Sequence, residues 1–61
     1  MNYTEKYLLL EKDSILGFFV LEEFEREHDA LEALESVSDG KSGVWRVVRA
    51  MEVTVASVAR A

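Results

Sequence analysis

The chain has 61 residues, 49% of them hydrophobic, and contains no cysteine. The lack of cysteine excludes disulfides, thiol nucleophiles and thiolate zinc sites, so a core of this size supplies only about 3–5 kcal/mol of stability unless the chain oligomerises. A formal net charge of −5 argues against direct nucleic-acid binding, because such binding depends on clusters of Lys and Arg.

The N-terminal segment lacks the basic patch and apolar core of a signal peptide, and the apolar runs elsewhere are too short to cross a membrane. We therefore expect one domain over residues 1–61, without membrane association, in the cytoplasm of a host cell. The hydrophobic content is high enough for the chain to fold rather than remain disordered.

Two strands are predicted in the first part of the chain. The apolar run Tyr7–Leu10 indicates a strand within residues 3–11, which the polar residues 12–14 end. After Gly17, a second apolar run continues into Phe24 among charged residues, which indicates a strand about nine residues long. The two strands should form a hairpin.

A helix is predicted next. Asp29 followed by Glu32 resembles a capping box, so we expect the helix to begin at Asp29 and to end at Asp39 and Gly40, after about two and a half turns. Glu32 and Glu35 should point to solvent. The face that packs on the strands is expected to contain Ala30, Leu31, Leu34 and Val37.

The C-terminal segment is ambiguous, because its apolar residues also fit a helical stripe. Six valines between positions 44 and 58 favour strands, which we predict at Trp45–Arg49 and Val53–Val58 with a bend near residues 50–52. A single bent strand and a helix over residues 44–59 stay open as alternatives. Alternation should place Trp45 in the core, on the face opposite Arg46.

The predicted order is therefore β-β-α-β-β, an α+β fold with one small antiparallel sheet and one helix packed across it. With this order, the chain resembles a group of small phage and prophage proteins of unassigned function. The resemblance rests on short segments at residues 7–11, 22–25, 32–34, 45–50 and 53–55. It implies an origin in a phage or mobile element but assigns no functional residue.

A fainter resemblance is to HicB-type antitoxins, through Glu-Lys-Asp at residues 11–13, Gly-Phe at residues 17–18 and the Glu-Ala-Leu helix at residues 32–34. The Pro- and Gly-containing segment typical of that family is missing, as is an attached DNA-binding region. This resemblance implies an antitoxin-like role with a cognate toxin.

Catalysis and metal binding are not predicted. His28 is the only histidine, and no nucleophile stands in a recognisable setting beside it. Glu25, Glu27, His28 and Asp29 match no metal-binding loop. The Gly-Lys-Ser sequence at residues 40–42 lacks the preceding glycine of a phosphate-binding loop and indicates only a connection. We expect no cofactor and no small-molecule substrate.

Acidic residues are concentrated in one stretch, with eight of the twelve between Glu22 and Asp39. Such a run is often no more than a solvated surface. Alternatively, carboxylates at every second strand residue imitate the phosphate spacing of DNA and would occupy a basic nucleic-acid channel of a partner. The chain resembles small anti-CRISPR proteins in size and charge, which is an analogy for this role. The residues predicted to bind a partner are Glu22, Glu23, Glu25, Glu27, Glu32 and Glu35.

The favoured function is thus a non-catalytic protein that binds and blocks a basic surface of a host or phage protein. Arg46 and Arg49 form a predicted second contact, because Arg is enriched at interface hot spots. The alternative is a homo-oligomerising module, for instance a homodimer formed by pairing of free sheet edges. An antitoxin-like protein is the third hypothesis.

Overall fold

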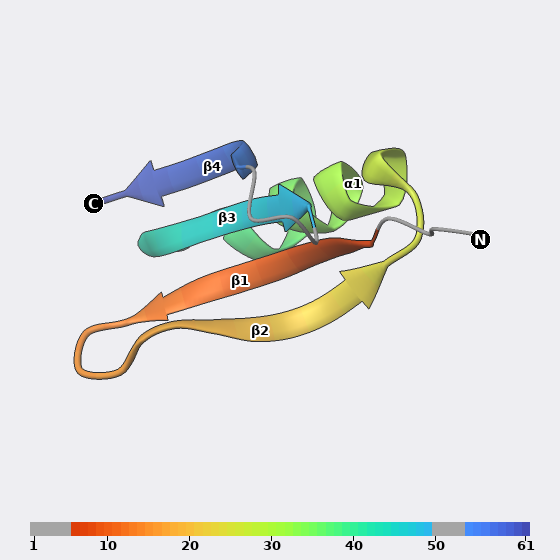
Figure 1. Ribbon diagram of the computed structural model, residues 1–61. Helices are drawn as coiled ribbons and strands as arrows, with labels where there is room; N and C mark the ends of the chain where they lie inside the picture. Colours follow the sequence, from red (N-terminus) through yellow and green to blue (C-terminus); the bar gives the residue numbers. More distant parts are fainter. Residues whose placement is uncertain (1–5, 50–53) are drawn as a thin grey trace.

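The computed structural model describes residues 6–49 and 54–61. Its elements, in chain order, are β1 (Tyr7–Asp13), β2 (Gly17–Phe24), α1 (Glu27–Ser38), β3 (Gly43–Arg49) and β4 (Thr54–Arg60). All strand pairs are antiparallel, and the sheet has the order β2-β1-β3-β4 (Figure 1). The predicted α+β fold with the order β-β-α-β-β is confirmed.

The two central strands supply the sheet side of the core. Leu9 of β1 lies opposite Val47 of β3, and both are buried beneath α1. Trp45, two residues before Val47, is only 3% exposed, so its predicted place in the core is confirmed. Arg46 lies between these two residues in the chain and therefore points to the opposite, open face of the sheet.

The helix side of the core consists of small and medium-sized side chains. Ala30 and Leu34 are buried, and Ser38 is also buried because its Oγ donates a hydrogen bond to the Leu34 carbonyl oxygen at 2.8 Å. Leu31, predicted for the core, is only partly buried. Ala33 packs against the core instead.

The predicted start of the helix was wrong. The helix begins at Glu27, with Arg26 as the N-cap residue and no side-chain capping bond, so Asp29 does not cap it. Glu27 and Asp29 instead lie in the first turn, where their negative charges interact favourably with the free backbone N–H groups of the helix. The helix thus starts two residues before the expected cap, with two acidic residues in its first turn.

The C-terminal segment forms two strands, so the helical alternative and the single bent strand for residues 44–59 are wrong. The strand β3 begins at Gly43, earlier than predicted, and β4 continues to Arg60, later than predicted. The expected bend at residues 50–52 and the first residues of the predicted strand one lie outside the described residues.

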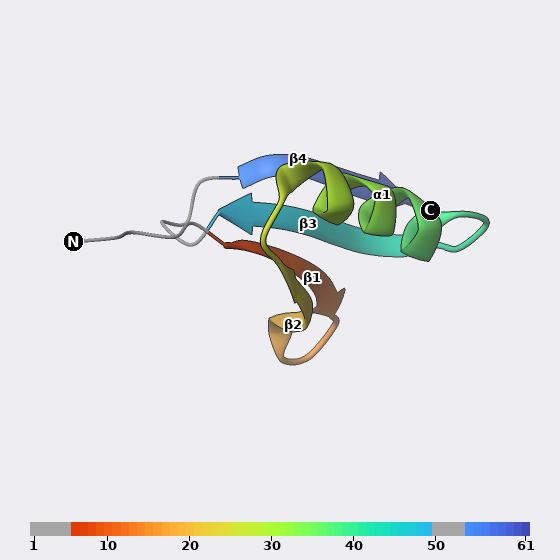
Figure 2. The ribbon, with the colours of Figure 1, turned by 90° about the vertical axis from the view of Figure 1, so that its right-hand side faces the viewer.

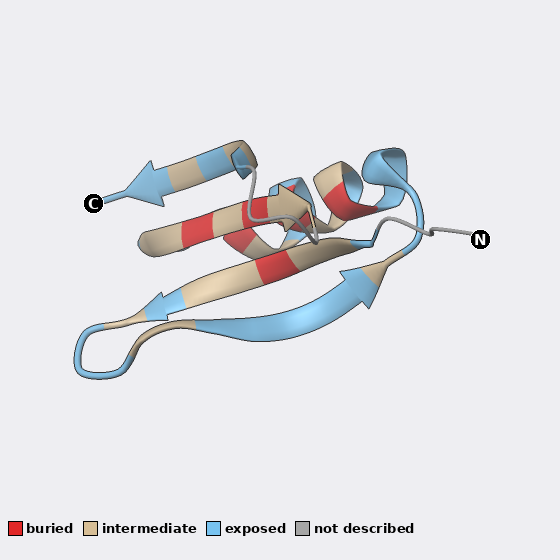
Figure 3. Cartoon of the chain, viewed as in Figure 1, coloured by how far each residue is buried: buried red, intermediate tan, exposed pale blue. Residues whose placement is uncertain are grey.

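The sheet is strongly twisted, and this twist decides which strand the helix covers. Figure 2 shows α1 lying along β3 on one side of the sheet, while the β1–β2 hairpin turns away from the helix. As a result, the core residues lie on β1, β3 and α1, and β2 is exposed along most of its length (Figure 3).

Candidate protein-binding surface

All six glutamates predicted to bind a partner are exposed, but the structure divides them among different surfaces. Glu22 and Glu23 are the only two within β2, and they are neighbours. Glu22 lies opposite the buried Leu9, on the helix side, whereas Glu23 lies opposite Leu8, on the open side. The expected row of carboxylates at every second residue of one strand is therefore not formed.

Two of these carboxylates have ionic partners. Lys6 Nζ lies 3.5 Å from Glu23 Oε1 on the open side of the sheet. On α1, His28 Nε2 lies 2.6 Å from Glu32 Oε2, one helical turn further along. Both pairs are largely exposed, so each contributes little to stability, about 0–1 kcal/mol. Glu22 has no ion-pair partner within residues 6–49 and 54–61.

The helical carboxylates also lie on different sides. Asp29 precedes Ala33 by four residues and Glu32 precedes Ser36 by four, so both belong to rows of α1 on the side of β2. Glu35 lies between these turns on the far side of the helix. Of these carboxylates, Glu22 lines the space between β2 and α1, and Asp29 and Glu32 lie one turn before residues of α1 that line it.

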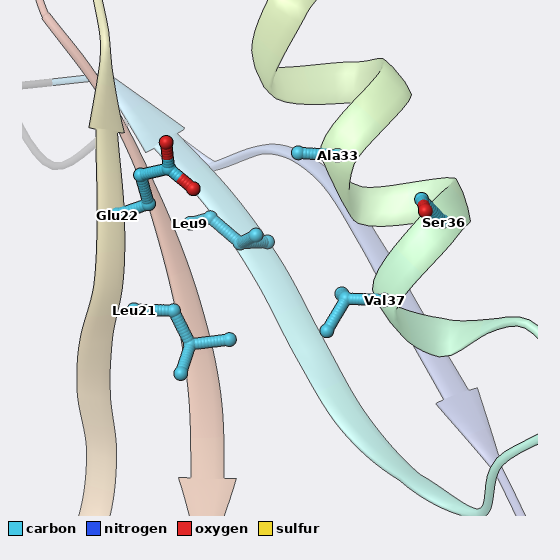
Figure 4. Close-up of a pocket in the computed structure, with 6 residues that line it drawn as sticks. All are labelled: Leu9, Leu21, Glu22, Ala33, Ser36 and Val37. Carbon is cyan, nitrogen blue, oxygen red and sulfur yellow. The ribbon is translucent and has the colours of Figure 1, made fainter.

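That space is a groove of about 370 Å³. It is lined by Leu9, Leu21, Glu22, Ala33, Ser36 and Val37, which Figure 4 shows on facing sides of the opening. The residues that line the groove at positions 33 and 36 of α1 have small side chains, which leave the groove open on the helix side. The groove thus has an apolar floor and one carboxylate on its β2 wall.

An irregularity in β2 explains the composition of this wall. Leu9 pairs with Glu22, whereas the next residue, Leu10, pairs with Val20, so Leu21 is an extra residue in a β-bulge. In a regular strand, Leu21 and Glu22 would point to opposite faces. The bulge lets both side chains line the groove, and the sequence alone contains no glycine or proline there to indicate it.

A second exposed feature is the end of the β1–β2 hairpin. The large hydrophobic residues described as exposed all fall within residues 15–21. Ile15 and Leu16 at the turn are 88% and 82% exposed, and Phe19, Val20 and Leu21 follow on the edge strand. Sequence reasoning predicted the hairpin but missed this exposure, although two large apolar residues beside Gly17 in a turn were an available signal.

The hairpin turn is fixed by Asp13. Its Oδ1 accepts hydrogen bonds from the backbone N–H of Ile15 at 2.7 Å and of Leu16 at 3.0 Å. These two bonds, that from Leu16 first, lower the pKa of the Asp13 carboxyl below its ordinary value. The hydrogen bonds to Asp13 therefore define the turn that exposes the apolar tip.

The two arginines predicted as a second contact are not brought together. Arg46 lies on the open face, with its guanidinium carbon 4.2 Å from the centre of the Phe18 ring. Arg49 is opposite Tyr7 and alternates with Val48, which places it on the helix side of the sheet. One arginine on each face cannot form a single contact surface.

Other chemistry is limited within residues 6–49 and 54–61. There, no three His, Asp or Glu side chains gather to hold a metal ion, and the side chain of His28 is 76% exposed. Residues 39–42 connect α1 to β3, as the sequence indicated for the Gly-Lys-Ser segment. None of the described helices is long and apolar enough to cross a membrane.

Comparisons of the chain with known protein families, curated proteins and solved structures find no match. The resemblances to small phage proteins and to HicB-type antitoxins therefore stay predictions.

Proposed function

We propose that the protein is a non-catalytic binding protein that covers a basic surface of another protein. The observation that carries this proposal is that five exposed apolar residues, Ile15, Leu16 and Phe19–Leu21, directly precede Glu22 at the start of the acidic stretch. Apolar contact supplies affinity when water is excluded, while the carboxylates steer the approach of a cationic surface and select against acidic ones.

The position of the apolar residues supports this proposal. They lie on a hairpin that leaves the body of the domain, so another protein can contact them without rearrangement of the core (Figures 1 and 3). A contiguous apolar patch on a small protein commonly marks an interaction surface. Ile15 and Leu16 pack little within the domain, which leaves their area available to a partner.

In the proposed mechanism, the hairpin tip contacts the partner and the carboxylates of Glu22, Glu25 and Glu27 face its basic groups. Together they occupy the basic surface and prevent a natural ligand from binding. The pattern resemblance to phage proteins would make that partner a host protein, with this protein as an inhibitor in the host cytoplasm. A protein that handles nucleic acid is the proposed class of partner, because its basic channel is a surface that carboxylates can occupy. Because the carboxylates do not form a regular row, charge rather than exact phosphate spacing is the basis of recognition.

Self-association is the second candidate, and the same exposed hydrophobic residues favour it. Pairing of sheet edges is the less favourable route, because both edge strands are irregular: β2 has the bulge at Leu21, and the register of β4 shifts where it pairs with Val47 and Val48. Bulges of this kind protect edges from adding further strands. A homodimer would more readily use the apolar hairpin.

The proposal is tested by capture of partners from a lysate of a candidate host with tagged protein, eluted in steps of rising salt. We expect a nucleic-acid-handling protein that is released by moderate salt, since exposed charge contacts weaken as screening increases. The triple variant Glu22→Lys, Glu25→Lys, Glu27→Lys should not capture it. Recovery of the same partner by this folded variant, or of only the protein itself in a salt-resistant form, would contradict the proposal.

A further inference from the structure

The groove between β2 and α1 combines features that are separate elsewhere on the surface. Its floor and walls contain the aliphatic side chains of Leu9, Leu21 and Val37, and its β2 wall ends in the Glu22 carboxylate. Leu21 is 41% exposed, so part of its apolar area is open to an incoming group. An apolar channel that ends at a carboxylate matches a side chain with a long aliphatic stem and a cationic head.

We propose that this groove holds a lysine or arginine side chain of the basic partner. The methylene groups lie against Leu21 and Val37, and the cationic head pairs with Glu22 at the rim. This inference deepens the proposed function and rests on it for the origin of the side chain, because it names the contact through which the basic surface is recognised.

The surrounding charges agree with this occupant. Asp29 and Glu32 lie one helical turn before the groove-lining Ala33 and Ser36, so the helix next to the groove is also acidic and an acidic side chain would be repelled. Glu32 also contacts His28, and a protonated imidazole would partly neutralise the Glu32 carboxylate. Glu22, which has no ion-pair partner among the described residues, is therefore the main contact for the cation.

The size of the groove also limits the occupant. About 370 Å³ lies near the lower end of the range of about 300–1,000 Å³ that is typical of ligand sites. The small side chains of Ala33 and Ser36 make the groove wide. The bulge in β2 places the neighbouring residues Leu21 and Glu22 on the same wall of the groove. A groove of this size takes one or two side chains rather than a large cofactor.

The inference is tested by NMR titration of the isotope-labelled full chain with three blocked pentapeptides. Each has four glycines around a central lysine, norleucine or glutamate. Norleucine keeps the four-carbon stem of lysine without the charge, and glutamate carries the opposite charge on a shorter stem. With the lysine peptide we expect saturable amide shifts at Leu21, Ala33, Ser36 and Val37. The norleucine peptide should bind more weakly, and the glutamate peptide should leave these amides unchanged.

Neighbouring residues provide a matched pair of variants. Glu22→Gln should weaken binding of the lysine peptide about two- to fivefold, the range of one exposed ion pair. Glu23→Gln, the next residue, lies on the open face and should have no effect. A third variant, Ser36→Phe, fills the groove from an exposed position and should abolish the shifts while the rest of the spectrum stays folded.

Several outcomes would overturn the inference: shifts outside the groove, equal binding of the norleucine peptide, equal effects of Glu22→Gln and Glu23→Gln, or no saturable shift at millimolar peptide. These results are separable from failure of the proposed function. If the Ser36→Phe variant still captures a salt-labile partner, only the inferred contact in the groove is contradicted. If the lysine peptide binds in the groove but no basic partner is captured, only the proposed function is contradicted.

Discussion

Trp45 Nε1 donates a hydrogen bond to Glu11 Oε1 across 3.0 Å, between residues that lie directly opposite each other on β3 and β1. The indole ring is almost fully buried, so its N–H has lost water and needs an acceptor. The carboxylate reaches it from the rim of the sheet. This bond therefore joins the core to the base of the exposed hairpin.

Replacement of Glu11 by Leu is expected to destabilise the protein by about 1–3 kcal/mol, because the buried indole N–H loses its acceptor. Glu11→Gln keeps an oxygen at the same position and should lose less. Urea unfolding followed by the fluorescence of Trp45, the only tryptophan, measures both variants. Equal losses for Leu and Gln would mean that the hydrogen bond is not the stabilising contact.

The Asp13 turn predicts a dependence of stability on pH. Because hydrogen bonds from Leu16 and Ile15 lower the pKa of Asp13 in the folded state, ionised Asp13 favours folding. This contribution is fully present above the unfolded-state pKa of about 3.9 and is lost as the pH falls through the lower pKa of the folded state.

Asp13→Asn is the variant that isolates this effect, since its amide oxygen still accepts from the backbone but does not titrate. Thermal unfolding between about pH 2 and pH 7 should show wild type more stable than the variant near neutrality, with the difference disappearing in acid. A difference that is constant over this pH range would show that the Asp13 charge does not contribute.

The fold could be predicted from the sequence where apolar periodicity is strong and the chain is regular. Trp45 and Leu34 were expected in the core and are there. The bulge at Leu21 could not be predicted, because it depends on how β2 pairs with β1 and not on a local glycine or proline. The groove follows from that bulge, so its residues were missed, whereas Glu22 was named only for its charge.

Gly43 is predicted to tolerate no side chain. Its φ of +145° is unfavourable for other residues, and a Cβ atom would lie 3.0 Å from the Cη2 atom of Trp45. Gly40 provides a control, because it also has a positive φ, of +69°, but has nothing within 4 Å of a Cβ. Gly40→Ala should cost about 1–2 kcal/mol and Gly43→Ala more. Equal losses in urea unfolding would contradict a close contact with Trp45.

Arg46 should be replaceable without loss of stability by an apolar residue of similar length. Its Nε is buried without a hydrogen-bond partner among the described residues, which offsets the attraction of its guanidinium to Phe18. Arg46→Met removes the unsatisfied N–H and keeps packing on the ring, so we expect a stability within about 0.5 kcal/mol of wild type. Arg46→Ala, which loses that packing, should be less stable; equal losses for Met and Ala would show that the charge itself is required.

Variants at the exposed hairpin tip are expected to change partner binding without changing the stability of the fold. Ile15→Ser with Leu16→Ser changes residues that are 88% and 82% exposed, and their backbone N–H groups still bond to Asp13. Stability should therefore stay within about 0.5 kcal/mol of wild type. If the tip contacts a partner, the double variant should capture much less of it at every salt concentration, whereas loss of the carboxylates should matter most at low salt. Full partner capture by the folded double variant would show that the tip does not contact another protein. A monomer–dimer equilibrium in light scattering that only wild type shows would mean that the tip mediates self-association.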